Sequence, residues 1–142
     1  MSMVDLTKFT PTFKTEFAQL ARDRKEDFEA LRKQGRWTAS VYLGPYIVEA
    51  RLKYKVCEVL KLERLPLVLK THNLFALIIF AGLFNELEAS PLLYDNFKKI
   101  AEIHKEVIYR YQVADPSHQT ASDNLNDWLF NPNNGVMTWL GL

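Results

Sequence analysis

The chain has 142 residues, of which 48% are hydrophobic and 25% charged, and its formal net charge at pH 7 is +1. This length and composition suit one domain over residues 1–142 with a single apolar core. The near-neutral charge excludes the strongly basic proteins that bind nucleic acid through their overall field, although it is compatible with a basic face of limited area.

The sequence contains a single cysteine, Cys57, which excludes a disulfide within the chain and is typical of reducing compartments. The N-terminus, MSMVDLTKFTPTF, lacks the order of charged, apolar and small residues that marks a signal peptide. The apolar run over residues 74–81 is much shorter than the ~20 residues that a membrane-spanning helix needs. We therefore expect a cytoplasmic protein without a membrane segment.

Prolines and glycines divide the chain into helical stretches, and strand-like alternation is nearly absent. Thr10 and Pro11 suit an N-cap and a first helical residue, so they predict a helix over residues 11–33 that ends near Gly35. A second helix is predicted over residues 39–62.

The second helix is expected to bend at Gly44 and Pro45, and Pro66 prevents its continuation. Beyond it, Thr71 or Asn73 is predicted to cap a third helix that ends near residue 86. Further helices are predicted over residues 91–111 and, more briefly, over residues 122–130. The predicted fold is an all-α antiparallel bundle of four main helices plus a short C-terminal helix.

The second predicted helix carries two charges on its apolar face, because Arg51, Lys55 and Glu58 define the opposite, polar side. Glu49 and Lys53 are therefore expected to point into the core. Burying a charge costs several kcal/mol unless it is paired, and Glu four residues before Lys is the favoured order for a pair. A structural ion pair is the simpler interpretation, and a ligand-binding role is the alternative.

The fourth predicted helix places His104 on an inward stripe that continues to Tyr111; the apolar members of the stripe are Leu93, Phe97 and Ile100. A buried histidine is more often a hydrogen-bonded core residue than a catalytic one, and both roles stay open here.

Arg110 lies on the flank of the same helix, one turn after Glu106. A surface ion pair between the two is worth ~0.3 to 0.5 kcal/mol. Alternatively, the guanidinium binds a phosphate or carboxylate through two nitrogens.

Four polar residues, Lys70, Thr71, His72 and Asn73, precede the most apolar run of the chain. The simpler interpretation is a helix cap. The alternative is an anion site, because the free N–H groups at a helix start attract negative charge and Lys70 would add to that attraction.

The sequence contains none of the common motifs for metal binding, phosphate binding or nucleophilic catalysis. His72, His104 and His118 show no close ligand spacing, and a single cysteine gives no zinc motif. There is no glycine-rich phosphate loop and no nucleophile elbow. We therefore expect neither a metal site nor a cofactor, and we interpret Cys57 as a small core residue.

Three short motifs together resemble the HEPN domain, a helical family of prokaryotes and higher eukaryotes. They are YIVEARLK at residues 46–53, KTHNL at residues 70–74, and the pair Arg110 and Tyr111. Members often carry an aromatic-rich helix with Glu and Lys four positions apart, a Lys-Thr-His-Asp-Leu-like helix start and an Arg-Tyr pair. The resemblance covers residues 42–111.

The resemblance implies a helical bundle, commonly dimeric, that serves in RNA cleavage, RNA or nucleotide binding, toxin–antitoxin pairs or antiphage defence. HEPN ribonucleases carry a histidine shortly after the arginine. In this chain the next histidine after Arg110 is His118, beyond Pro116, and His104 comes before the arginine.

The leading hypothesis is therefore a non-catalytic HEPN-like module that binds RNA, a nucleotide or a protein partner such as a co-encoded nucleotidyltransferase, and that forms a homodimer. The expected ligand-binding residues are Glu49, Lys53, Lys70, Thr71, His72, Asn73 and Tyr111.

Two alternatives stay open. The first is a metal-independent ribonuclease in which His104 or His72 is the general base and Arg110 stabilises the developing charge. The second is a purely structural helical subunit that associates through apolar surface, including Trp128 and Trp139.

Overall fold

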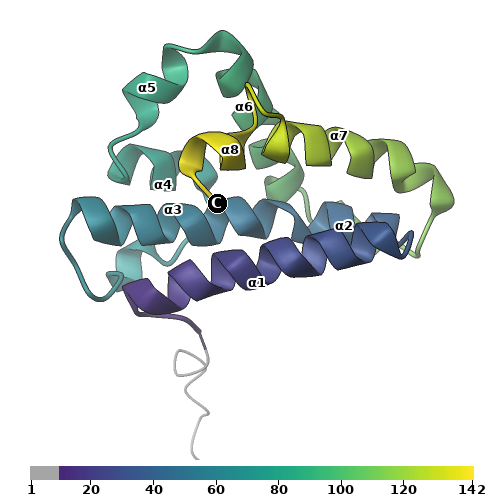
Figure 1. Cartoon of the computed structure of the whole chain (residues 1–142). Coiled ribbons are helices and arrows are strands. Elements are labelled where there is room, and N and C mark those ends of the chain that lie inside the picture. Colours follow the sequence, from purple (N-terminus) through teal and green to yellow (C-terminus); the bar gives the residue numbers. More distant parts are fainter. Residues whose placement is uncertain (1–9) are drawn as a thin grey trace, which may run out of the picture.

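The computed structural model describes residues 10–142, apart from the side chains at positions 107 and 108, and this part of the chain is all-α (Figure 1). The all-α class predicted from the sequence is thereby confirmed. Residues 1–9, which form most of the segment inspected for a signal peptide, lie outside the described residues.

Helix α1 (Lys14–Lys33) begins later than predicted, because residues 11–13 stay outside the helix. Its first turn is capped by Glu16, whose carboxylate accepts hydrogen bonds from the backbone N–H of Phe13 at 2.9 Å and of the preceding residue at 3.2 Å. The helix ends as predicted near Gly35, which has the positive φ of 71° that glycine readily adopts.

The expected bend in the second helix is a break between α2 (Trp37–Leu43) and α3 (Pro45–Val59). Gly44 at this junction permits close packing, because a Cβ atom there would lie 2.7 Å from the side chain of Leu125 in α7 (Gln119–Phe130). The prediction of a bend at this position is confirmed.

The predicted third helix is wrong in length, because α4 (Leu74–Phe80) and α5 (Phe84–Glu88) stand in its place. Gly82 separates them with a φ of 72°. The cap is as predicted, since the side chain of Asn73 accepts a hydrogen bond from the N–H of Ala76 at 3.1 Å.

The apolar run after that cap packs in the interior of the protein. Leu74, Leu77 and Ile78 of α4 are buried in the core. Within residues 10–142, no helix is both long and apolar enough to span a membrane.

Helix α6 (Pro91–Lys105) also ends before its predicted end at residue 111. A 3₁₀ segment, Val107–Arg110, follows it. Tyr111 therefore leaves the inward stripe and is 82% exposed. The chain closes with α7 and α8 (Val136–Leu140), and these shorter helices leave the predicted four-helix arrangement unconfirmed.

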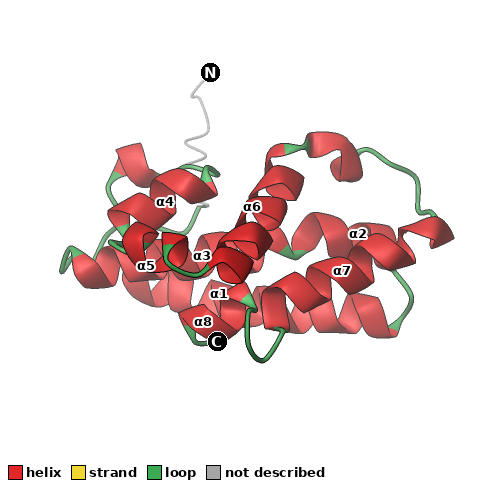
Figure 2. Cartoon of the chain, turned by 90° about the horizontal axis from the view of Figure 1, so that it is seen from above, coloured by secondary structure: helices red, strands yellow, loops and turns green. Residues whose placement is uncertain are grey.

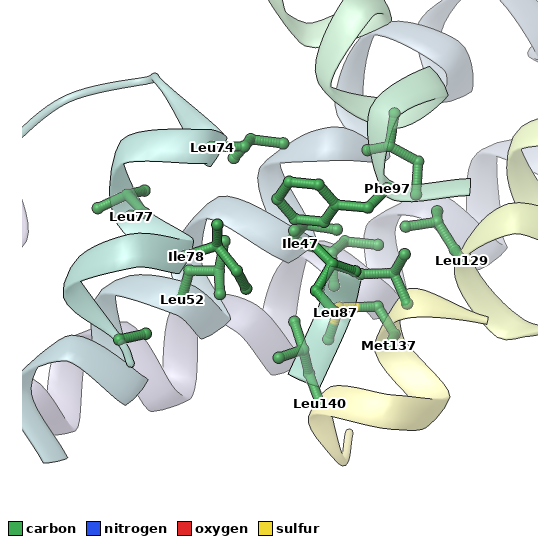
Figure 3. Packing of buried hydrophobic residues seen from close by; sticks show 14 of the residues in the cluster. Ile47, Leu52, Leu74, Leu77, Ile78, Leu87, Phe97, Leu129, Met137 and Leu140 are labelled. Atoms are coloured by element: carbon green, nitrogen blue, oxygen red, sulfur yellow. The ribbon is translucent and has the colours of Figure 1, made fainter. Parts of the chain in front are cut away.

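Helix α3 lies at the centre of the arrangement. It packs against α1, α4, α6 and α8 (Figure 1). Seen from above, α6 lies between the α4–α5 pair and α7 (Figure 2). Figure 3 shows the result, a cluster in which Ile47 and Leu52 of α3 meet Phe97 of α6 and Met137 of α8. Because α3 is covered by these helices, side chains on most of its circumference are enclosed, including Cys57 as predicted.

Candidate functional site

A cluster of hydrogen bonds surrounds the carboxylate of Glu49, at the place where α3, the start of α4 and α6 meet. Oxygen Oε1 lies 2.6 Å from Nδ1 of His72 and 2.8 Å from Nε2 of His104, and Oε2 lies 3.2 Å from Nζ of Lys53. Because an ionised carboxylate only accepts hydrogen bonds, both imidazole nitrogens act as donors in this arrangement. We call these four residues the Glu49 cluster.

Three members of the Glu49 cluster are buried, as the sequence predicts. Glu49 and Lys53 lie four residues apart on α3 and form the expected ion pair. His104 points inward from α6, with 2% of its side chain exposed. The predicted burial of these three side chains is confirmed.

His72 comes from the short segment before α4 and keeps 68% of its side chain exposed. The two polar neighbours of His72 hold this segment in place. The hydroxyl of Thr71 accepts a hydrogen bond from the N–H of Asn73 at 3.1 Å, and Asn73 caps α4. The caps on either side thus fix the residue that completes the cluster.

Burial alone would raise the pKa of the Glu49 carboxyl, because the charged form loses its hydration. The hydrogen bond from His104, the charge of Lys53 and the hydrogen bond from His72 together outweigh that effect and hold the pKa below its ordinary value. Glu49 is therefore an anion at neutral pH, and its partners compensate the charge.

Tyr46 links the Glu49 cluster to Arg110. Its ring packs edge-on against His104, with ring centres 4.6 Å apart, and its hydroxyl accepts a hydrogen bond from the Arg110 guanidinium. Arg110 therefore bonds Tyr46 in place of the pairing with Glu106 that the sequence suggested. Its guanidinium also lies 5.8 Å from the ring centre of Tyr42.

An open groove of about 760 Å³ lies outside the Glu49 cluster, between the start of α4 and one face of α6. Its lining includes five of the residues that the sequence singled out, namely Thr71, His72, Asn73, His104 and Arg110. The structure thus gathers residues from two of the three motifs, together with His104, along one groove.

The rest of the lining was not predicted. Tyr94, Lys98, Ala101 and Lys105 form one stripe of α6 along the groove. Their spacing of four, three and four residues is the signal that places them on one helix face. This spacing does not by itself indicate a binding surface, because the stripe borders the solvent-facing side of α6, where surface lysines are common.

Two of the predicted ligand-binding residues lie elsewhere. The ammonium of Lys70 bonds the hydroxyl of Thr12 at 2.8 Å and lines a separate hollow beside the start of α1. Tyr111 is exposed and is not among the residues that line the groove. The anion site expected at the start of the third helix also loses support, because α4 has only seven residues.

Arg110 also borders a second hollow, of about 520 Å³. Here the lining combines cationic and aromatic side chains, among them Arg36, Trp37, Tyr42 and Tyr109. Arg110 therefore borders two concave surfaces, each of which offers positive charge and aromatic rings.

The Glu49 cluster also brings together potential metal ligands. One ligand atom each from Glu49, His72 and His104 lies within 4.8 Å of the others. Spacing along the sequence did not reveal this group, because its members come from three elements far apart in the chain.

Comparisons with protein-family models, with curated proteins and with solved structures gave no match to this chain. The HEPN resemblance accordingly rests on the short motifs themselves.

Proposed function

We propose that this chain is a HEPN-like helical module that binds single-stranded RNA along the groove between the start of α4 and α6. The observation that carries the proposal is the composition of the groove. Three cations, Lys98, Lys105 and Arg110, face it with a single acidic residue, Glu102. Such a surface attracts phosphates even though the whole chain is nearly neutral.

Aromatic side chains in the groove supply the second requirement of RNA binding. Phe75 and Tyr94 lie along its lining, half-buried and in contact with each other at 6.3 Å between ring centres. Bases stack on such rings whatever their sequence, while neighbouring cations hold the backbone. The combination favours a nucleic acid over a simple anion.

The second hollow favours an RNA strand over a mononucleotide. Arg110 lines both concave surfaces, so a strand that crosses it reaches Arg36 and the rings of Trp37 and Tyr42. A mononucleotide fills only one of the two hollows. An oligonucleotide should therefore bind more tightly than the same nucleotide alone.

Within this proposal the Glu49 cluster positions groups that contact the ligand. Glu49 holds Nδ1 of His72, an exposed residue of the groove lining, so Nε2 is the ring nitrogen available to a ligand. Lys53 neutralises the buried carboxylate and does not itself line the groove. The HEPN resemblance further suggests a homodimer in a defence or toxin–antitoxin system, with a co-encoded nucleotidyltransferase as partner.

The orientation of His72 favours a second candidate function, metal-independent RNA cleavage. Its free nitrogen would remove the proton from a ribose 2′-hydroxyl, whose oxygen attacks the adjacent phosphorus. A 2′,3′-cyclic phosphate forms, and the 5′-oxygen leaves and takes up a proton from water. Arg110 would stabilise the charge on the phosphoryl oxygens. The side chain of His104 is only 2% exposed and is bonded to Glu49, so it suits a supporting role.

Fluorescence anisotropy with a labelled single-stranded RNA tests the binding proposal. Lys105→Ala and Arg110→Ala should each weaken binding about tenfold or more, as expected for a lost charge-assisted contact. Arg36→Ala should weaken binding of the RNA while leaving mononucleotide binding unchanged. The matched control is Arg22→Ala, which removes an exposed cation from α1 outside both hollows.

Equal RNA affinities for the parent, Lys105→Ala and Arg110→Ala proteins would refute binding in this groove. Electrophoresis of the RNA after incubation separates the two candidate functions. Intact RNA supports a binding module, whereas cleavage that survives chelator and disappears in His72→Ala supports the ribonuclease.

A further inference from the structure

Three potential metal ligands converge beside the groove, each from a different part of the fold. Glu49 projects from the central helix α3, His104 from α6, and His72 from the segment before α4. We infer that Oε1 of Glu49, Nδ1 of His72 and Nε2 of His104 form a binding site for a divalent transition-metal ion, with zinc as the best match. This inference is independent of the proposed RNA binding.

The donor set matches the preferences of zinc. Zn²⁺ binds imidazole nitrogen and carboxylate oxygen, and two histidines with one glutamate are a known three-ligand set for sites that keep a fourth position open. Calcium and magnesium prefer an all-oxygen environment, which two imidazoles do not provide. The chemistry of the three side chains thus points to a borderline transition ion.

The distances define what must change when the ion binds. The two nitrogens lie 2.6 and 2.8 Å from Oε1, as hydrogen bonds require. Ligand atoms around a tetrahedral zinc ion are about 3.3 Å apart, given bond lengths of about 2.0 to 2.1 Å. Each nitrogen therefore needs to move away from Oε1 by roughly 0.5 to 0.7 Å, and each imidazole must present a lone pair in place of its N–H.

The surroundings of the cluster allow this adjustment. The backbone at His72 is held by its neighbours, but the side chain is exposed, so its ring can rotate outward, while His104 is held against Tyr46 within the packed interior. Lys53 bonds the other oxygen of Glu49 and keeps Oε1 directed at the two rings. Supporting contacts of this kind orient ligands in established metal sites.

The groove gives the ion an open coordination position. His72 and His104 both line the groove, so the side of the cluster between their rings faces the same space as Lys98 and Arg110. A water molecule or an anionic oxygen can occupy that position. The site therefore has the form of three protein ligands with one exchangeable ligand.

The test uses the full chain without an affinity tag, stripped with chelator and dialysed. Isothermal titration with Zn²⁺ alone, together with metal analysis after gel filtration, should give one ion per chain. His72→Ala should weaken the affinity for Zn²⁺ by at least about tenfold, since loss of even a supporting residue has that effect in known sites. His72 is exposed, so its variant should keep the parent circular dichroism spectrum.

The matched control is His118→Ala, which removes a histidine bonded to Thr38, outside the three-ligand group. It should bind Zn²⁺ as the parent does. Glu49→Gln, if folded, should also lose affinity, because the amide is a poor zinc ligand. Substoichiometric binding by the parent, or equal affinity in the parent and His72→Ala, would overturn the inference and leave the cluster as a set of hydrogen bonds.

Discussion

Glu49 is the residue on which the candidate site depends, because a single carboxylate connects α3, α6 and the segment before α4. Its two oxygens contact one ammonium and two imidazoles, and none of the buried side-chain nitrogen or oxygen atoms in the described residues lacks a hydrogen-bond partner. Such a network is stable only when complete, since each member left without its partner becomes a desolvated polar group.

A double-mutant cycle on Glu49 and Lys53 tests this interdependence. Lys53→Met leaves an anion without its ammonium, and Glu49→Gln leaves a buried cation without its anion, so each should lower the free energy of unfolding by about 3 kcal/mol. The double variant removes both charges and should lose less than the sum of the two. Urea unfolding followed by circular dichroism measures the three values. Strict additivity would show that the pair is not coupled.

The helical periodicity of the sequence was enough to place Glu49, Lys53 and His104 inside, because charged or polar residues on an apolar stripe must be buried. It was not enough to predict their partner. His72 lies in an irregular segment where no periodicity applies, and its position depends on the caps formed by Thr71 and Asn73. Contacts between side chains of different elements depend on how the elements pack, and the periodicity of one sequence does not reveal that packing.

At the scale of the elements, the sequence located helices better than helix ends. The apolar periodicity continues past Gly82, so α4 and α5 were predicted as one helix, although the positive φ of this glycine separates them. Likewise α6 was extended to residue 111, whereas Arg110 belongs to a 3₁₀ segment. The early end of α6 matters for the site because Arg110 there bonds Tyr46.

The start of α1 gives a prediction on pH dependence. The hydrogen bond from the backbone N–H of Phe13, and then that from Thr12, lower the pKa of Glu16 below the ordinary value of 4.5. A carboxyl with a lowered pKa in the folded state stabilises above its unfolded pKa, and the contribution is lost as the pH falls through the folded pKa. Glu16→Ala should therefore cost about 0.5 kcal/mol at neutral pH, a small value because solvent screens this exposed carboxylate, and progressively less below pH 4.5.

Urea unfolding of the parent and Glu16→Ala proteins at a series of pH values from 7 downward measures this difference. Glu26→Ala, on an exposed position of the same helix, is the control and should show no such convergence. A difference that stays constant with pH would mean that the ionised carboxylate of Glu16 does not cap α1.

Gly44 tests how tightly α7 packs against the junction of α2 and α3. Its φ of −52° and ψ of −46° suit any residue, so alanine would meet only a steric obstacle. The new Cβ would lie 2.7 Å from Leu125 and 3.1 Å from Phe28, both fully buried. Gly44→Ala should lower the free energy of unfolding by about 1 to 3 kcal/mol, measured by urea denaturation.

The cost of Gly44→Ala should shrink when Leu125 is also changed to alanine, because the added methyl group then enters the space that the leucine leaves. A neutral Gly44→Ala variant would show that α7 readily moves away from this junction.

At the scale of the whole molecule, the fold gathers a basic, partly aromatic groove on a chain whose net charge is only +1. Lys98 and Lys105 come from α6, whereas Arg110 comes from the 3₁₀ segment after it and His72 from the start of α4. The overall composition does not reveal this groove, because its basic residues are balanced by acidic residues elsewhere in the chain and meet only when the helices pack.

The most direct test of RNA binding in this groove is the salt dependence of the affinity. For single strands, the logarithm of the binding constant falls with the logarithm of salt concentration by about 0.7 for each phosphate neutralised. We predict that Lys98→Ala/Lys105→Ala makes this slope shallower by about 1.4, while Arg22→Ala leaves it unchanged. The same slope and affinity in the parent and the double variant would contradict RNA binding in the groove.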